Sequence, residues 1–216
     1  VSIFARHGLQ LSFDAGKSEA IIHLMGPESR HVARTAFSYR ENGTFLCIAQ
    51  DLDIKLVQSY KHVGTVASHI GSLMPEIRRR SQQMYASYRP LASSTFARRC
   101  WPLPVKFCLA EALLYTRLFF GCGSWDLPSS EGLAVLHTAY MRPVRAILGI
   151  CSDDHIGDVQ ALSQAALPGI AMRLRMERLL YASKLVRDAP QILRALIQNV
   201  GGNVLPWVRL VAGDVR

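Results

Sequence analysis

The hydrophobic period of this sequence changes between residues 66 and 72, and this change limits the folds that the chain can adopt. Before it, short runs rich in β-branched and aromatic residues alternate with turn residues, a pattern that predicts strands. After it, apolar residues recur three and four positions apart, which predicts amphipathic helices. We therefore expect an α+β first part followed by helical parts. The strands are predicted at residues 19–25, 44–49, 54–58 and 60–66.

The first two helices of the later part are predicted at residues 72–91 and 105–120, and the second of these has the strongest helical pattern in the chain. An arginine run at 78–80 falls on the outer side of the first helix, and a Gly-Cys-Gly triplet at 121–123 ends the second. The inner side of the first is predicted as Ile77, Met84, Tyr85, Tyr88 and Leu91. The inner side of the second is predicted as Val105, Cys108, Leu109, Ala112, Leu113, Thr116, Phe119 and Phe120.

A third helix is predicted at residues 133–148 and is closed by Gly149. Ser152 or Asp153 can cap a short helix that runs to Ala166, and Pro168 opens a last long helix. The predicted inner side of the third helix is Leu133, Leu136, Tyr140, Val144 and Ile147. The predicted inner side of the last helix is Met172, Met176, Leu179, Leu180, Ser183 and Val186, and Trp101 and Trp125 are predicted as core residues beside the second helix.

The charge balance of the chain favours a polyanionic partner. The sequence has 216 residues, half of them hydrophobic, which is enough for the cores of one or two domains. Its net charge of +9 arises although only 19% of its residues are charged, because arginines outnumber acids locally. The simplest partner for such a surface is nucleic acid.

The five cysteines show no Cys-x-x-Cys pair, so we interpret them as reduced core thiols of an intracellular protein rather than zinc ligands. The most apolar stretch, residues 105–120, is interrupted by Lys106, Glu111 and Arg117, which argues against a membrane span. The chain lacks an initiator methionine and opens like the end of a helix, so we expect it to be part of a longer protein. A truncated element, a mis-split gene and an excerpt are all compatible with this interpretation.

The triplet Gly16, Lys17 and Ser18 ends like a phosphate-binding loop, but the surrounding residues do not fit one. Such a loop needs a glycine five residues before Gly16, where Leu11 stands, and it needs a helix after it. The residues that follow are predicted as a strand. The sequence therefore argues against a nucleoside-triphosphatase site.

The same triplet has a place in another pattern. Residues 8–13, GLQLSF, followed by residues 16–20, GKSEA, resemble the "GL-x-L-N … K-T-E" block of reverse transcriptases from non-LTR (LINE-type) retrotransposons. In that family the block is motif D of the polymerase palm. Residues 59–64, SYKHVG, are similar to the family's "YKYLG" primer-grip hairpin.

Later segments resemble the thumb region of the same family, in the same order. Residues 76–80, EIRRR, are similar to "EI-x-RRI", and residues 113–125 resemble "L-x-S-x-LLYG-x-ETW". Residues 142–149 and 174–180 stand where the family has "R-x-x-R-x-I-x-G" and "R-x-x-RL". No single motif is specific, but together, in the family's order, they cover most of the chain.

The resemblance implies the end of a right-hand polymerase palm, followed by an all-helical thumb and a helical C-terminal extension. The implied boundaries are residues 1–66 for the palm part, 67–150 for the thumb and 151–216 for the extension. The tail after Gly201 is expected to be ragged. The implied partners are RNA and DNA, held as primer and template through their backbone phosphates, with no membrane partner.

The catalytic turn of that family, "A/F-x-DD", has no counterpart in this sequence. Its two aspartates hold the metal ions that drive phosphoryl transfer. Asp153 and Asp154 form the only Asp-Asp pair, and they lie far downstream in a predicted helix cap. We therefore expect no polymerisation by this chain alone, no cofactor bound by it, and Mg²⁺ only in a complete polymerase.

The resemblance makes Lys17 the motif D lysine, which would approach the triphosphate of the incoming nucleotide; a solvated lysine at a strand edge explains it equally well. Tyr60, Lys61 and Gly64 would hold the primer end, although ordinary hairpin chemistry also accounts for the glycine.

Six arginines are candidates for contacts with nucleic-acid phosphates. A solvated helix face is the alternative for the first three, and the chain-wide charge and the nearby Lys106 favour phosphate contact. The candidates are Arg78, Arg79, Arg80, Arg89, Arg98 and Arg99.

Two other functions compete with a primer- and template-gripping fragment. One is a stand-alone basic helical module that binds RNA or DNA without regard to a primer end. The other is a degenerate, non-functional element product, which would not melt cooperatively.

Overall fold

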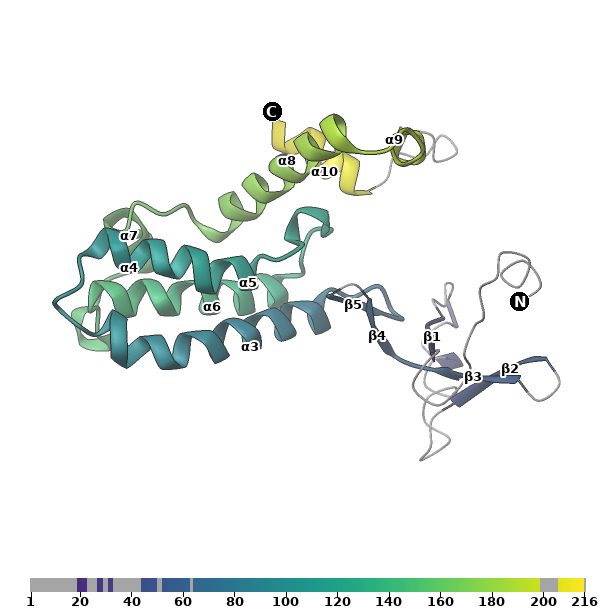
Figure 1. The fold of residues 1–216 in the computed structure, drawn as a ribbon, viewed down its shortest axis with the longest axis horizontal. Helices are drawn as coiled ribbons and strands as arrows, with labels where there is room; N and C mark the ends of the chain where they lie inside the picture. Colours follow the sequence, from purple (N-terminus) through teal and green to yellow (C-terminus); the bar gives the residue numbers. More distant parts are fainter. Residues whose placement is uncertain are drawn as a thin grey trace. The chain divides into compact units, whose positions relative to one another are not determined.

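The computed structural model describes residues 19–22, 27–28, 31–32, 44–49, 52–62, 64–198 and 206–215 (Figure 1). The chain divides into two compact units, residues 1–75 and 76–216, which are described separately below. The first unit contains short strands and the second is helical, so the α+β class predicted from the change of period is confirmed. No helix within the described ranges is both long and apolar enough to cross a membrane.

The first unit has a three-stranded sheet in the order β1-β3-β2. Strand β1 (Glu19–Ala20) is parallel to β3 (Leu52–Leu56), and β2 (Thr44–Ala49) is antiparallel to β3. The predicted bounds of β2 are confirmed, whereas β3 begins two residues earlier than predicted. Of the strand predicted at 19–25, only β1 is a strand, and residues 23–25 lie outside the described residues.

A separate hairpin consists of β4 (Ser59–His62) and β5 (Thr65–Ser68), paired antiparallel. The single strand predicted at 60–66 is therefore wrong. A hairpin begins at Ser59, as the similarity of residues 59–64 to a hairpin motif predicts, and its second strand extends to Ser68. Gly64 has φ +85°, a left-handed conformation that allows the chain to reverse without a Cβ clash. The hydroxyl of Thr65 donates to the His62 carbonyl oxygen at 2.9 Å and closes the turn.

The second unit is built on three neighbouring helical segments (Figure 1). They are α3 (Met74–Leu91), the run α4 (Leu103–Ala110), η2 (Glu111–Tyr115) and α5 (Thr116–Leu118), and α6 (Ser130–Leu148). Arg78 near the start of α3 pairs with Glu131 near the start of α6, and Arg142 late in α6 lies over Tyr88 late in α3. Helices α3 and α6 therefore run in the same direction.

Short turns and further helices complete the unit. After α3 comes the π-helix η1 (Ala92–Phe96), and after α5 the 3-10 turn η3 (Cys122–Ser124). The remaining elements are η4 (Ser152–Asp154), α7 (Asp158–Gln164), α8 (Ile170–Asp188), α9 (Gln191–Gln198) and α10 (Pro206–Val215). The ragged tail predicted after Gly201 is therefore wrong for the residues of α10, which pair with α8 through Asp214 and Arg178.

An aromatic cluster lies at the centre of the helical core. The ring of Tyr140 lies 4.9 Å from that of Tyr115 and 5.7 Å from that of Phe119, centroid to centroid. The Tyr115 hydroxyl donates to the Tyr140 carbonyl oxygen at 3.1 Å, and the Tyr140 hydroxyl donates to the Pro168 carbonyl oxygen at 3.0 Å. Burial raises the pKa of Tyr140 to about 12 and that of Tyr115 further, so both act as neutral packing groups.

The prediction for α6 is largely confirmed. Leu136, Tyr140, Val144 and Ile147 are buried, while Leu133 is half-buried. The Ser129 side chain caps the helix by accepting from the Gly132 N–H at 3.2 Å. Gly149 ends it with φ +71°, as a left-handed C-cap.

The face predicted for the second helix is wrong, although the helix itself is present. Its buried side chains are instead spaced by four residues: Lys106, Ala110, Leu114 and Leu118, with Tyr115 and Phe119 beside them. Residues four apart drift around a regular α-helix, and the wider π turn η2 compensates for that drift. The segment is apolar on nearly every side, so its periodicity could not select the buried face.

The face predicted for α8 is also wrong. Met172 and Met176 are 50% and 44% exposed, and the buried residues of the helix are Leu174 and Arg178. Arg178 binds both carboxylate oxygens of Asp214 in α10, at 2.7 and 3.1 Å. A distant carboxylate thus allows an arginine to be buried, which hydrophobic spacing cannot reveal.

The predicted burial of the tryptophans and cysteines is wrong in part. Trp125 is buried as predicted, but Trp101 is 44% exposed. Among the cysteines whose burial the structure describes, Cys122 is buried, and the others are exposed thiols rather than core thiols: Cys100, Cys108 and Cys151.

Candidate nucleic-acid interface

The positive charge of the chain is concentrated in its second unit. Residues 76–216 contain 18 lysines and arginines against 10 acids, a net charge of +8. Residues 1–75 contain 7 against 6. The candidate interface is therefore a feature of the helical unit.

Within that unit, residues 77–110 contain six arginines and one lysine but no acid. These are the arginines that sequence analysis selected. Any carboxylate that neutralises them must come from outside the segment, and the structure separates the residues that have such a partner from those that do not.

Arg80 is held inside the fold. Its Nε lies 2.6 Å from Glu76 Oε1, its guanidinium lies 4.3 Å from the centre of the Phe120 ring, and its side chain is 6% exposed. The prediction that it lies on the exposed side of the helix is wrong. Arg80 follows Ile77 by three positions and precedes Met84 by four, so helix geometry places it on the buried face.

Arg79 and Arg78 are progressively more exposed. Arg79 lies 3.4 Å from the same Glu76 carboxylate, with 22% of its side chain exposed. Arg78 is 63% exposed and pairs with Glu131 at 3.0 Å. A surface pair of this kind contributes about 0–1 kcal/mol, so Arg78 can exchange Glu131 for a phosphate at little cost.

Lys106 belongs to the core as well. It is buried, and its Nζ donates to the Phe96 carbonyl oxygen at 2.7 Å. Its predicted contribution to a phosphate-binding surface is therefore wrong. The ammonium group instead caps the end of η1 from within.

Arg89, Arg98 and Arg99 are different. All three are exposed, and their guanidinium groups make no ion pair or hydrogen bond with any residue that the structure describes. Arg89 lies in the last turn of α3, while Arg98 and Arg99 lie in the loop between η1 and α4. These three cations remain available for a ligand.

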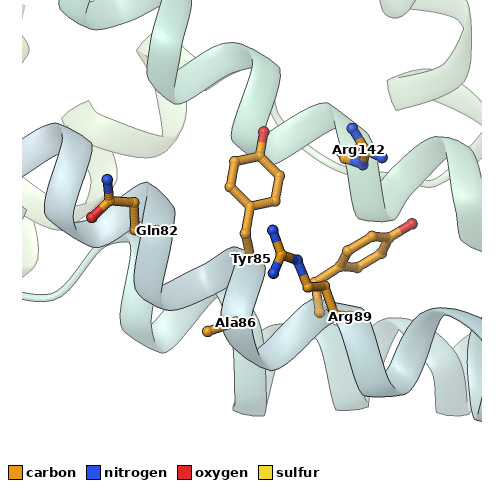
Figure 2. Close-up of a pocket in the computed structure, with 6 residues that line it drawn as sticks. Gln82, Tyr85, Ala86, Arg89 and Arg142 are labelled. Carbon is orange, nitrogen blue, oxygen red and sulfur yellow. The ribbon is translucent and has the colours of Figure 1, made fainter.

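Beside them, a groove of about 450 Å³ lies between α3 and α6. Figure 2 shows Gln82, Tyr85 and Arg89 along α3, with Arg142 on the neighbouring helix. The Arg142 guanidinium carbon lies 5.9 Å from the centre of the Tyr85 ring and 6.0 Å from that of Tyr88. Aromatic rings and guanidinium groups of this kind can stack on bases and pair with phosphates.

The Tyr88 ring has a second neighbour, the ring of Phe96. It lies 6.1 Å from the buried Phe96 ring, at an interplanar angle of 24°. Tyr85 and Tyr88 are predicted as core residues, and the structure leaves both half-buried along the groove. Nothing in the sequence predicts that Arg142 lies opposite Tyr85, because the two residues belong to different helices.

The predicted primer-grip residues lie in the first unit. Tyr60 pairs with Ala67 and Lys61 with Val66 in the hairpin register. Tyr60 and His62 share one face of β4, with ring centres 6.2 Å apart, and Lys61 is exposed. Lys17, the predicted motif D lysine, lies outside the described residues.

Asp153 and Asp154 lie in the 3-10 turn η4, where Asp154 Oδ2 accepts from the Cys151 N–H at 2.6 Å. The predicted cap of a helix running to Ala166 is wrong, because α7 starts separately after Gly157. Within the described part of the chain, no three His, Cys, Asp or Glu side chains are grouped closely enough to hold a metal ion.

A further ion cluster joins α6 to α7. Asp158 accepts from His137 Nε2 at 2.8 Å and from the Arg145 guanidinium at 2.5 Å. The hydrogen bond from Arg145, followed by that from His137, holds the pKa of the Asp158 carboxyl below its usual range. Arg145 is therefore a structural cation, unlike Arg142 one helical turn earlier.

Comparisons of the chain with protein-family models, with curated proteins and with solved structures found no match.

Proposed function

We propose that this chain holds nucleic acid, as the primer- and template-gripping part of a LINE-type RNA-directed DNA polymerase. The observation that carries the proposal is the set of exposed arginines without carboxylate partners, Arg89, Arg98 and Arg99, in an acid-free segment. Arg142 on the adjacent helix extends this set. The order of the sequence motifs supplies the polymerase context.

Phosphate binding follows from the chemistry of these groups. A guanidinium group matches two phosphate oxygens at once, and each phosphate neutralised releases condensed counterions. Arginines already paired with carboxylates would first have to break those pairs. Arg89, Arg98 and Arg99 have no such pair to break, so they are expected to dominate binding.

The proposed role is grip rather than chemistry. Phosphoryl transfer would need the two metal-binding aspartates of a complete palm, with Mg²⁺ held there. In such a protein Lys17 would approach the triphosphate, and Tyr60, Lys61 and Gly64 would hold the primer end. The chain alone is expected to bind RNA–DNA hybrid and to extend no primer.

The test is hybrid-duplex binding by fluorescence anisotropy over a series of salt concentrations. Replacing Arg89, Arg98 and Arg99 by alanine should lower affinity equally for unrelated sequences and reduce the slope of log K against log salt by about 2–3. The control for location replaces Lys184, Arg187 and Arg209, three exposed cations on α8 and α10 that lie outside the acid-free segment 77–110. Equal losses in both triple variants, or no binding by the unmodified chain at low salt, would overturn the proposal.

A second arm separates the polymerase fragment from a stand-alone basic module. A hybrid with a recessed 3′ end is compared with a blunt hybrid of the same length. Preference for the recessed end supports a polymerase grip, whereas equal affinity for both supports the stand-alone module.

A further inference from the structure

The groove between α3 and α6 contains aromatic rings and hydroxyl groups as well as the positive charge that phosphate binding requires. It combines two tyrosine rings with the guanidinium groups of Arg89 and Arg142. The hydroxyl groups of Tyr85 and Tyr88 make no hydrogen bond to any residue within the described ranges. These side chains bring together, in one groove, an aromatic surface, two cations and two hydroxyl groups that can hydrogen-bond to a ligand.

We propose that this groove binds one unpaired nucleotide of a single strand, with its base stacked beside Tyr85 and its phosphate paired with Arg89 or Arg142. This inference rests on the proposed nucleic-acid function and adds the kind of strand that is recognised. The base edge would meet the tyrosine hydroxyls, which can both donate and accept hydrogen bonds.

The size of the groove favours a single nucleotide. Its volume of about 450 Å³ falls in the range of small-ligand sites, about 300–1,000 Å³. Bases inside a duplex are stacked on one another and hide their faces, so only an unpaired base can enter such a groove. A duplex would meet only the exposed cations around it.

The two tyrosines have different roles. The buried Phe96 ring stacks near Tyr88, so packing restrains the Tyr88 ring. Arg142 lies near both rings and keeps a positive charge beside any stacked base. Tyr85 is half-buried and has no aromatic neighbour among the described residues, so its ring is the surface on which an incoming base can stack.

The test compares a short single-stranded oligonucleotide of one unstructured sequence with a blunt hybrid, both bound to the full chain. Tyr85→Leu keeps a shorter apolar side chain and removes the aromatic face. It should weaken single-strand binding about tenfold and leave hybrid binding within twofold. Tyr85→Phe should retain single-strand binding within about threefold, because it keeps the stacking surface.

Arg89→Ala supplies a second variant that does not disturb packing, since Arg89 is exposed. It should weaken both single-strand and hybrid binding, because phosphate contact serves both. Thermal melting of each variant shows whether the fold is retained. A base analogue whose fluorescence falls on stacking, placed within the oligonucleotide, should be quenched by the unmodified chain and by Tyr85→Phe but not by Tyr85→Leu.

The outcomes separate the two proposals. Hybrid binding that persists while Tyr85→Leu leaves single-strand affinity unchanged, or weakens both ligands equally, overturns the unpaired-nucleotide site and leaves the proposed grip standing. Absence of binding to either ligand overturns both. Displacement of the oligonucleotide by a free nucleoside monophosphate at similar concentration would show that the groove binds a mononucleotide rather than a strand. That result would overturn the proposal.

Discussion

The two ends of helix α3 contain the same residue types and use them differently. In its first turns Arg79 and Arg80 share the carboxylate of Glu76, and Arg80 is buried against Phe120. In its last turns Arg89 is exposed beside Tyr85 and has no carboxylate partner within the described residues. The number of arginines in a segment therefore does not measure its capacity to bind phosphate. The position of the nearest carboxylate does.

The largest expected effect is a loss of stability at the start of α3, where Arg80 pairs with Glu76. Arg80→Ala should lower the free energy of unfolding by about 3–5 kcal/mol, because it removes the shortest ion pair of the buried Glu76 carboxylate. Urea unfolding measures this loss. Arg78→Ala is the control two residues earlier, on the exposed surface of the same helix, with an expected change within about 0.5 kcal/mol. A stable Arg80→Ala chain with weakened hybrid binding would place Arg80 in the interface instead.

Lys106 extends the comparison to a buried cation outside α3. Lys106→Met keeps the apolar stem but loses the Nζ hydrogen bond to the Phe96 carbonyl oxygen. The expected loss of stability is about 1–3 kcal/mol, because a polar group is left unsatisfied. Nucleic-acid affinity should not change once the variant is folded. Unchanged unfolding in urea would contradict the structural role of this ammonium.

At the end of α3 that contains Arg89, a substitution should affect binding and not stability, the reverse of the expectation for Arg80. Arg89→Ala should change stability by less than about 0.5 kcal/mol, lower hybrid affinity several-fold and flatten the salt slope by about 1. Arg187→Ala is its control, because Arg187 is equally exposed but pairs with Asp188 on α8. Anisotropy titrations at several salt concentrations distinguish the two. Equal effects of the two variants would mean that exposure alone, without regard to pairing, sets the contribution of an arginine.

The smallest expected effect concerns the paired cations of α6. Because the pKa of Asp158 is lowered in the folded state, its ion pairs stabilise the fold above the unfolded pKa of about 3.9 and are lost as pH falls through the folded value. The carboxylate is 39% exposed, so the contribution is below about 1 kcal/mol. Asp158→Asn should remove this part of the acid dependence. Melting curves of both chains between neutral pH and pH 3 should converge as the pH falls.

Where polar and apolar residues separate cleanly, the sequence predicts the fold well. Helix α6 shows this, with a serine cap before it, a glycine after it and one apolar face between them. The α4–α5 run was predicted as a helix on the wrong face, because it is apolar almost all round and contains a π turn. For α8, burial of Arg178 depended on Asp214, which lies 36 positions later in the chain.

The candidate site, too, can be predicted from the sequence only in part. The charge pattern of the sequence indicates the arginines but does not separate Arg80 from Arg89. The spacing of Arg80 from Ile77 and Met84 does indicate that Arg80 lies on the buried face. No such signal exists for the groove, because Tyr85 and Arg142 are brought together only by the packing of α3 against α6.

The sequence by itself determined the α+β class, the existence of most helices and the sign of the charge, because period and composition are local properties of the chain. Tertiary structure alone decided which cations are neutralised and where an aromatic groove lies. Ion pairs and grooves are made between residues that are distant in the chain. Their energies depend on which partners the packing brings together, and not on the residue types alone.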